Sequence, residues 1–220
     1  MYSAIIVAAG QGERTGLKMN KVLYPLHHKP VILYAIEAFK ADKDCTEIIV
    51  VCKEENQEDI LKISNDLVHK YVLGGKTRQE SVYNGITEAK EKYVIIHDGA
   101  RPYLPKTLLA NIKKAMVKYG AVTSAIPITD TVKRTYLNKI TEDINRENLV
   151  AIQTPQAFEK SQLIKAYQMS KKTYTCDASL VQEVLKLDVA IVIGDKKNIK
   201  FTSFEDIELL ELILHDSYRA

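Results

Sequence analysis

The stretch Ala4-Ile-Ile-Val-Ala-Ala-Gly10-Gln-Gly-Glu-Arg14-Thr-Gly-Leu-Lys-Met-Asn-Lys21 joins a short β-branched run to a glycine-rich loop. Residues 4–7 predict a buried strand, and the small residues after it allow a backbone to approach a ligand closely. Backbone N–H groups exposed in such a loop can hold phosphate oxygens. A plain surface turn has the same composition, so the glycines alone leave both interpretations open.

Two better-known glycine-rich loops do not match this stretch. The dinucleotide fingerprint G-x-G-x-x-G and the Walker pattern G-x-x-x-x-G-K-[ST], started at Gly10, both require glycine where the chain has Thr15. The distinguishing feature is instead the pair Arg14 and Lys21, two cations at the two ends of the loop. Both can converge on one polyphosphate, where catalysis of group transfer is largely positioning and charge stabilisation. Two solvated cations on a turn are the alternative.

Similar β-branched runs recur along the chain, separated by segments of helical apolar periodicity. We predict strands at residues 4–7, 47–51, 71–73, 93–96, 121–126 and 189–193, and helices at 30–39, 55–67, 78–89, 105–119 and 204–214. This alternation predicts a three-layer α/β fold, with a mostly parallel twisted sheet and helices on both faces. Such sheets bind ligands at the carboxyl ends of their strands, so the loops after Val7, Leu73, Ile96 and Ile126 should carry the chemistry.

Residues 130–150 interrupt the alternation with many charges and few core candidates. A turn at Asn138 between two short β-prone runs predicts a projecting β-hairpin arm. An isolated two-stranded hairpin is marginally stable, so we expect the arm to pack on the same arm of a second subunit in a homodimer. A solvated hairpin on a monomer is the alternative. The whole chain, residues 1–220, is expected to form one domain that carries this arm.

The composition narrows the class of protein. The 31 basic residues nearly balance the 28 acidic ones and are scattered, so we expect small-molecule partners and no nucleic acid. Cys45, Cys52 and Cys176 form no C-x-x-C pair and no secretory leader is recognisable, which predicts a cytoplasmic protein. No apolar run reaches the roughly 20 residues of a membrane span, so no membrane association is expected.

The turn His97-Asp-Gly-Ala-Arg101-Pro102 follows the predicted strand at residues 93–96. Asp98 should therefore face the ligand crevice without a structural partner, as a candidate ligand of Mg²⁺, because this ion takes one or two carboxylates together with phosphate oxygens. A turn or helix-cap aspartate is the alternative. Arg101 can neutralise a substrate phosphate, and His97 is expected to be structural.

Further motifs accompany this turn and the glycine-rich loop. They read Gly74-Gly75-Lys-Thr-Arg78-Gln-Glu-Ser81-Val82, Pro127-Ile-Thr-Asp130-Thr131-Val-Lys133, Thr154-Pro-Gln-Ala-Phe158 and Asn198-Ile-Lys200. Six motifs in this order are far more specific than any one of them. Over nearly its whole length, the chain resembles the 2-C-methyl-D-erythritol 4-phosphate cytidylyltransferases of isoprenoid-precursor synthesis.

The resemblance implies a Rossmann-like nucleotidyltransferase fold and a Mg²⁺-dependent enzyme of the non-mevalonate pathway. Such an enzyme transfers CMP from CTP to 2-C-methyl-D-erythritol 4-phosphate, giving 4-diphosphocytidyl-2-C-methyl-D-erythritol and pyrophosphate. The implied catalytic cations are Arg14, Lys21 and Lys200. The implied CTP-binding residues are Ala8, Ala9, Gly10, Gly12, Gly75, Ser81 and Asp98. The implied acceptor-binding residues are Asp98, Arg101, Thr131, Arg146, Thr154 and Lys200, and Arg146 would serve a neighbouring subunit if the arm crosses a dimer interface.

The chain departs from the family pattern at two positions. Lys76 and Cys176 stand where many relatives have acidic residues, and Asp177 is then expected to cap a helix. Two other functions compete with the main prediction. A ribitol-5-phosphate cytidylyltransferase shares several motifs, although its loop usually begins Ala-Gly-Gly rather than Ala8-Ala9-Gly10. A noncatalytic nucleotide-binding regulator is the other, and the retention of Arg14, Lys21 and Lys200 counts against it.

Overall fold

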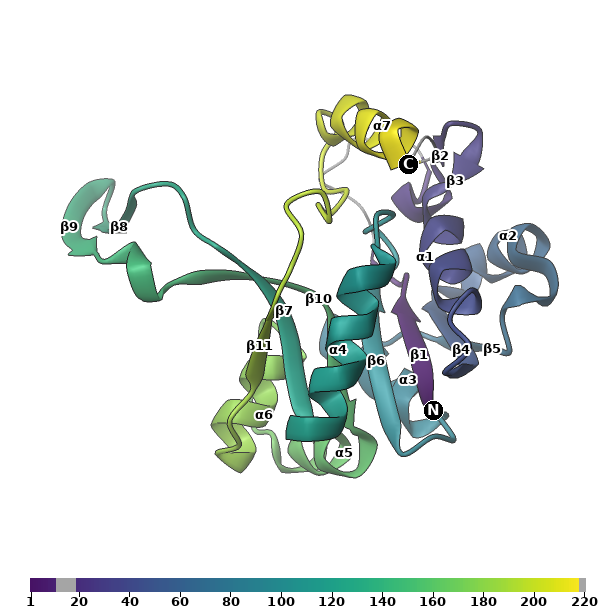
Figure 1. Cartoon of the computed structure of the whole chain (residues 1–220), viewed down its shortest axis with the longest axis horizontal. Helices are drawn as coiled ribbons and strands as arrows, with labels where there is room; N and C mark the ends of the chain where they lie inside the picture. The colour runs from purple at the N-terminus through teal and green to yellow at the C-terminus, as the bar shows by residue number, and fades with distance from the viewer. Residues whose placement is uncertain (11–18, 218–220) are drawn as a thin grey trace.

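The computed structural model describes residues 1–10 and 19–217, and its centre is a seven-stranded sheet (Figure 1). The strands lie in the order β11-β7-β10-β6-β1-β4-β5. Strand β10 is antiparallel to both of its neighbours, and the remaining ladders are parallel, so the prediction of a mostly parallel sheet is confirmed. The sheet consists of β1 (Tyr2–Val7), β4 (Cys45–Cys52), β5 (Lys70–Leu73), β6 (Tyr93–Asp98), β7 (Ala121–Pro127), β10 (Val150–Glu159) and β11 (Ala190–Ile193).

Helices cover both faces of the sheet, which confirms the three layers. Alternate side chains of a strand point to opposite faces, so Ile6 of β1 enters one core and Ile5 enters the other. The first core lies under α1 (Val31–Lys40), α2 (Glu54–Ser64), α4 (Lys106–Tyr119) and α7 (Asp206–Ser217). The second lies under α3 (Arg78–Thr87), α5 (Lys160–Met169) and α6 (Asp177–Leu185). None of the helices in the described part of the chain has the length and apolar character that a membrane crossing requires.

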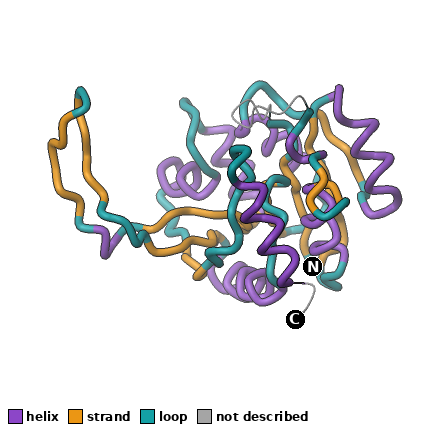
Figure 2. The backbone as a smooth tube through the Cα atoms, turned by 90° about the horizontal axis from the view of Figure 1, so that it is seen from above, coloured by secondary structure: helices purple, strands orange, loops and turns teal. Residues whose placement is uncertain are grey.

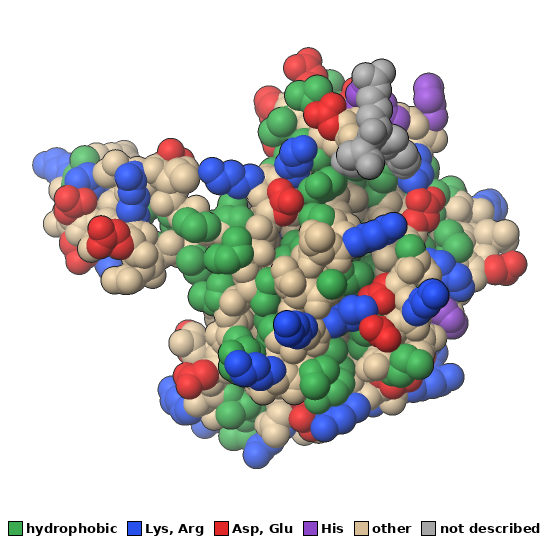
Figure 3. Space-filling model, in the orientation of Figure 1, with side chains coloured by type: hydrophobic (Ala, Val, Ile, Leu, Met, Phe, Trp, Pro, Cys, Tyr) green, Lys and Arg blue, Asp and Glu red, His purple; other side chains and the backbone are tan. Residues whose placement is uncertain are grey.

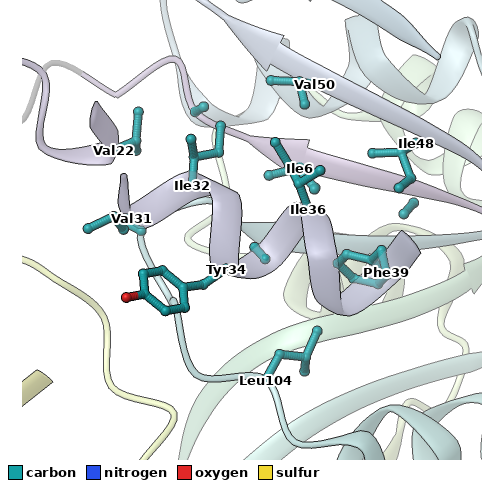
Figure 4. Close-up of a cluster of buried hydrophobic side chains, with 14 of the residues drawn as sticks. Ile6, Val22, Val31, Ile32, Tyr34, Ile36, Phe39, Ile48, Val50 and Leu104 are labelled. Atoms are coloured by element: carbon teal, nitrogen blue, oxygen red, sulfur yellow. The ribbon is translucent and has the colours of Figure 1, made fainter. Parts of the chain in front are cut away.

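The first core anchors the segment that follows the glycine-rich loop. Apolar residues recur along α1 at helical spacing, and Ile32, Ile36 and Phe39 are fully buried against the sheet. Figure 4 shows Val22, from the 3-10 helix η2 (Lys21–Leu23), beside this cluster. The buried Val22 therefore fixes the position of the neighbouring Lys21. A small two-stranded ladder, β2 (Pro25–Leu26) with β3 (Lys29–Pro30), joins η2 to α1.

Among the described strands of the central sheet and the α-helices that cover it, three were not predicted: β10, α5 and α6. The sequence 150–159 contains Pro155, which lacks an N–H group and argues against a central strand. The pairing of β10 with β7 shifts register between Ile152 and Gln156, and this irregularity accommodates the proline. A further difference is that the helix predicted at 55–67 ends at Ser64, and the 3-10 helix η3 (Asn65–Leu67) follows it.

The segment after β7 forms a β-hairpin arm that projects far from the sheet (Figures 1 and 2). It consists of β8 (Val132–Tyr136), β9 (Lys139–Ile144) and the 3-10 helix η4 (Arg146–Asn148). Leu137 and Asn138 form the turn with φ of 48° and 60°, the left-handed conformation of a tight hairpin turn. Tyr136 and Leu137 at the tip are 71% and 77% exposed, so the arm makes few apolar contacts within this chain. The predicted hairpin is thus present.

Candidate active site

Two cavities open at the carboxyl ends of the parallel strands, where the sequence predicts the site. The larger has a volume of about 570 Å³ and contains both described ends of the glycine-rich loop. Its lining includes Ala8, Ala9, Gly10, Lys21, Lys53, Gly75, Lys76, Arg78, Ser81, Asp98 and Lys200. The structure therefore assembles most of the predicted CTP-binding residues around one space of nucleotide size.

The smaller cavity, of about 300 Å³, adjoins the larger one and shares three lining residues with it, which form a common wall. The wall consists of Arg78, Asp98 and Lys200, which line both cavities. Predicted acceptor-binding residues that line the smaller cavity are Asp98, Arg101, Thr154 and Lys200. The site thus has two compartments that meet at one carboxylate and two cations.

Two predicted site residues in the described part of the chain line neither cavity, and two more lie outside that part. Gly12 and Arg14 lie outside the described residues. Thr131 and Arg146 belong to the arm, are exposed, and do not line the cavities of the same chain. Arg146 donates a hydrogen bond from Nη1 to the carbonyl oxygen of Thr129. The contribution of these residues to a site stays a prediction.

Asp98, at the end of β6, is surrounded by cations. Lys200 Nζ donates to Oδ2 at 2.8 Å, Arg78 Nε donates to Oδ1 at 3.3 Å, and Arg101 Nε lies 3.7 Å from Oδ2. Burial opposes ionisation of Asp98, but the charges of Arg78, Lys200 and Arg101 outweigh it and hold the pKa well below its usual range. The expectation that Asp98 lacks a structural partner was therefore wrong.

A buried hydrogen-bond chain fixes the backbone of this turn. The Asp98 N–H donates to Thr154 Oγ1 at 3.0 Å, and that hydroxyl lies 3.2 Å from His97 Nδ1. His97 Nε2 lies 3.0 Å from the carbonyl oxygen of Arg101, which can only accept, so Nε2 carries the proton and Nδ1 accepts from Thr154. Burial lowers the pKa of His97 to about 4. His97 is thus a neutral structural residue, as predicted.

Arg101 lines the smaller cavity. Its Nη1 donates to the carbonyl oxygen of Asn198 at 2.6 Å, which fixes the guanidinium. Its Nε is buried and has no hydrogen-bond partner among the described residues, since the 3.7 Å separation from Asp98 is too long for a hydrogen bond. The guanidinium as a whole brings a positive charge to the smaller cavity, and that charge suits an anionic ligand.

The paired glycines after β5 shape the floor of the larger cavity. A Cβ on Gly74 would stand 2.3 Å from Ala9 Cβ, so only glycine lets this loop approach the loop after β1. The Gly75 N–H donates to Ser81 Oγ at 3.1 Å, and the Ser81 hydroxyl donates to the carbonyl oxygen of Thr77 at 2.9 Å. Ser81 therefore holds the loop in shape, and its predicted contact with a base would use its remaining acceptor capacity.

Sequence reasoning assigned no role to Arg78, Lys53 or the charge of Lys76, although all three line the larger cavity. Arg78 is the first residue of α3 and bridges two carboxylates, Asp98 at 3.3 Å and Asp177 at 2.9 Å. Asp177 lies 99 residues further along the chain, so no local pattern announces the pair. The sequence did contain one signal, which was Arg78 itself: it is a cation three residues after the Gly74-Gly75 pair.

The sequence prediction that Asp177 caps a helix was wrong. The N-cap of α6 is Cys176, whose Sγ accepts from the Ser179 N–H at 3.5 Å. Asp177 is the first residue of the helix, where the positive end of the helix dipole favours a carboxylate. Its side chain is 2% exposed and is committed to Arg78 and to the hydroxyl of Tyr167.

The residues present fit a magnesium ion only in a limited way. Among the described residues no three metal-ligating side chains gather, and Asp98 is the carboxylate that lines the larger cavity. Both of its oxygens already accept from cations, but a carboxylate has about four acceptor positions. One carboxylate with phosphate oxygens and waters is a normal Mg²⁺ environment.

Fold and site together define an α/β protein with two adjoining, cation-lined cavities beyond the carboxyl ends of its strands, where proteins of this class bind their ligands. The sequence profile of the 2-C-methyl-D-erythritol 4-phosphate cytidylyltransferase family matches residues 2–216. The chain belongs to this family.

Curated proteins and solved structures agree with this assignment. Proteins named 2-C-methyl-D-erythritol 4-phosphate cytidylyltransferase are 39% identical in Bacillus thuringiensis (strain Al Hakam), covering 98% of both chains, and 37% identical in Bacillus pumilus (strain SAFR-032), covering 97% and 96%. The crystal structure of 4-diphosphocytidyl-2C-methyl-D-erythritol synthase from Anaerococcus prevotii superposes with a TM-score of 0.85 at 30% identity, covering 97% of this chain and 98% of that one. The cytidylyltransferase structure from Thermus thermophilus gives 0.81 at 26% identity, with coverages of 96% and 98%.

Proposed function

We propose that this chain is an enzyme that transfers CMP from CTP to 2-C-methyl-D-erythritol 4-phosphate, releasing pyrophosphate. Family membership over residues 2–216 supports the activity, and one structural observation carries the assignment to this site. The two cavities share Arg78, Asp98 and Lys200, so a nucleotide in the larger and a phosphomonoester in the smaller meet at these residues. Two phosphorylated substrates held side by side are what a nucleotidyl transfer requires.

The proposed reaction is a direct displacement. An oxygen of the acceptor phosphate attacks the α-phosphorus of CTP, forming one P–O bond while the bond to the departing pyrophosphate breaks. The phosphate is already anionic near neutral pH, so the site needs no general base. Lys21 and Lys200 line the nucleotide cavity and would compensate the negative charge of the transition state, and Arg14 is predicted to join them.

Each compartment has residues suited to its proposed ligand. The Gly74-Gly75 loop and Ser81 would contact the cytosine, and the cations that line the larger cavity would contact the triphosphate. Arg101 would hold the acceptor phosphate with its guanidinium, and Lys200, which lines both cavities, would contact both ligands. Mg²⁺ held by Asp98 and CTP phosphates would supply additional charge neutralisation when bound.

The arm is proposed to complete the site of a second copy in a homodimer. Its tip exposes Tyr136, Leu137 and Ile140, and Figure 3 shows hydrophobic surface between the arm and the body of the molecule. Exposed apolar surface on an otherwise unsupported hairpin suits a second subunit. Thr131 and Arg146 would then reach the partner's acceptor compartment. The three free cysteines, Cys45, Cys52 and Cys176, suit the reducing cytoplasm in which we place the enzyme.

The test is pyrophosphate release with CTP and each acceptor at matched concentrations. We expect turnover with 2-C-methyl-D-erythritol 4-phosphate and at least tenfold lower kcat/KM with ribitol 5-phosphate. The reverse preference would assign the chain to ribitol phosphate activation. CTP binding without turnover of either acceptor would instead support a nucleotide-binding regulator.

A further inference from the structure

We infer that Arg78, Asp177 and Tyr167 form a positioning chain that holds Asp98 in the wall between the two cavities. This inference deepens the proposed function and rests on it for its kinetic consequences. The sequence motifs assigned no role to Arg78 or Tyr167, and they gave Asp177 only the role of a helix cap, which the structure corrects. Tyr167 lies on α5 and Asp177 on α6.

The chain begins at Tyr167, a residue that lines neither cavity. The Tyr167 hydroxyl on α5 donates to Asp177 Oδ1, and the other oxygen of Asp177 accepts from Arg78 Nη1 at 2.9 Å. Arg78 Nε then donates to Asp98 Oδ1 at 3.3 Å. Each hydrogen bond uses a different atom, so the Arg78 guanidinium joins the buried carboxylate of Asp177 to the carboxylate of Asp98.

The burial of these groups makes the arrangement demanding. The Asp177 side chain is 2% exposed and that of Asp98 is 9% exposed, whereas the Arg78 side chain is 29% exposed and lines both cavities. A buried carboxylate is stabilising only when its hydrogen bonds and charge are fully compensated, and hydrophobic residues commonly replace such pairs without loss. Stability alone therefore does not explain why this position carries an aspartate.

Arginine is the residue that this geometry requires. Its planar fork can present Nε to one carboxylate and Nη1 to another at the same time, whereas lysine offers a single point charge. Burial opposes the charge of Arg78, but Asp177 and then Asp98 outweigh it and raise its pKa, so the bridge stays charged. With Lys200 on the opposite oxygen, Asp98 is held from two sides.

The consequence concerns where the two substrates meet. Asp98 borders both compartments, so its carboxylate sets the boundary between the nucleotide and the acceptor phosphate. Releasing Arg78 from Asp177 would let the guanidinium and Asp98 move, and a misplacement of about 1 Å can cost roughly 100-fold in rate. Groups that orient residues in direct contact with the ligand typically matter about 10 to 100-fold.

The experiment is a double-mutant cycle of Arg78→Gln and Asp177→Asn, measured by pyrophosphate release and by thermal unfolding. We expect Arg78→Gln to lower kcat about 100-fold and Asp177→Asn about 10-fold, each with KM for CTP within about threefold of wild type. The double variant should lie within about threefold of Arg78→Gln alone, because Asp177 acts through Arg78. The inference would be overturned if the two single-variant losses in kcat multiplied in the double variant, or if Asp177→Asn kept the kcat of wild type.

Asp42→Asn is the matched control. Asp42 accepts from the hydroxyl of Tyr2 and from Lys113, as Asp177 accepts from Tyr167 and Arg78, but it lies at the opposite end of the sheet. It should lower the melting temperature as much as Asp177→Asn does and leave kcat within about twofold. Equal kinetic losses in both variants would reduce the effect to general destabilisation and contradict the inference.

Two further measurements keep the outcome decisive. If Arg78→Gln does not fold, Tyr167→Phe replaces it in the cycle. We expect Tyr167→Phe to lower kcat about threefold in the wild-type background and to have no effect on kcat in the Asp177→Asn background. A crystal structure of Asp177→Asn tests the positioning without any turnover. We expect the contact between Arg78 Nε and Asp98 Oδ1 to open beyond 4 Å, and an unchanged contact overturns the inference. Inactivity of the wild-type chain would refute the proposed function alone.

Discussion

The two ends of the central sheet carry the same chemical unit with different surroundings. At the carboxyl end, Tyr167, Asp177 and Arg78 are linked through the two oxygens of one carboxylate. At the amino end, the Tyr2 hydroxyl donates to Asp42 at 2.9 Å and Lys113 donates to the same carboxylate at 2.7 Å. Both units join elements that are distant in sequence.

The difference lies in the second partner of the cation. Lys113 also contacts Asp44, whose side chain is 58% exposed and lines neither of the two cavities, whereas Arg78 also contacts Asp98, which lines both. A tyrosine, a carboxylate and a cation can therefore stabilise the fold at one end of the sheet and position a site residue at the other. The role depends on where the second carboxylate bound by the cation lies.

The largest effect expected at the carboxyl end comes from Lys21→Ala. Lys21 lines the nucleotide cavity and is held there by the buried Val22, so its removal deletes a fixed cation and leaves the core intact. Turnover should fall about 1000-fold, as it does when a charge-stabilising donor is lost from other enzymes. Pyrophosphate release and a circular dichroism melt measure the two properties. Near-normal turnover would remove Lys21 from the mechanism.

Arg101→Ala sharpens the comparison within the carboxyl end, because Arg101 lines only the smaller of the two cavities. We expect KM for the acceptor to rise about 30-fold, the loss of roughly 2 kcal/mol from one charge-assisted contact. KM for CTP should stay within about threefold. Initial rates at varied concentrations of each substrate separate the two constants, and an equal rise in both would contradict the division into two compartments.

At the amino end, Asp42→Asn should cost about 2 kcal/mol of folding free energy and lower the melting temperature by roughly 4 to 8 °C at neutral pH. Burial opposes ionisation of Asp42, but hydrogen bonds from Lys113, the Asp44 N–H and Tyr2 outweigh it and lower its pKa from 3.8. The folded pKa lies below the unfolded one, so this stabilisation is present above pH 3.8 and is lost as the pH falls through the folded pKa. Melting curves from pH 7 to pH 3 should converge for wild type and variant. A constant difference would show that the carboxylate charge is not involved.

The smallest expected effect concerns the cap of α6, which positions Asp177. Sulfur is a weak hydrogen-bond acceptor, and Cys176 accepts from the Ser179 N–H at 3.5 Å. Cys176→Asp supplies a strong N-cap at the positive end of the helix and should stabilise the protein by about 0.5 to 1 kcal/mol, or roughly 2 °C. Differential scanning calorimetry measures this, with Cys45→Ser as the comparison at a cysteine outside any helix cap. A lower melting temperature for Cys176→Asp would contradict the capping geometry.

Much of the fold follows from local patterns in the sequence. The runs around Ile5, Ile49 and Ile95 predict buried strands because nearly all their residues are apolar, and α1 and α4 carry apolar residues at helical spacing. The same patterns place the site, since loops at the carboxyl ends of parallel strands converge. What local patterns miss is β10, where Pro155 conceals a central strand.

The contacts of the site depend on tertiary structure that no local pattern encodes. Asp98 was predicted from its position after a strand, but its neutralisation by Arg78, Arg101 and Lys200 combines residues up to 102 positions apart. Asp177 was predicted to cap a helix because the neighbouring Cys176 stands where many relatives have an acidic residue. Its actual contacts with Arg78 and Tyr167 require the packing of α3, α5 and α6 on one face.

The arm has a consequence for engineering this enzyme. Pro127, the last residue of β7, pairs with Val150, the first residue of β10, so the hairpin leaves and re-enters the sheet at one pair of facing residues. The entropy of closing a loop changes by only about 0.6 kcal/mol for each doubling of its length. Residues 128–149 are therefore a graft point, where a hairpin from a relative or a tether to a second enzyme can be inserted at little cost to the sheet.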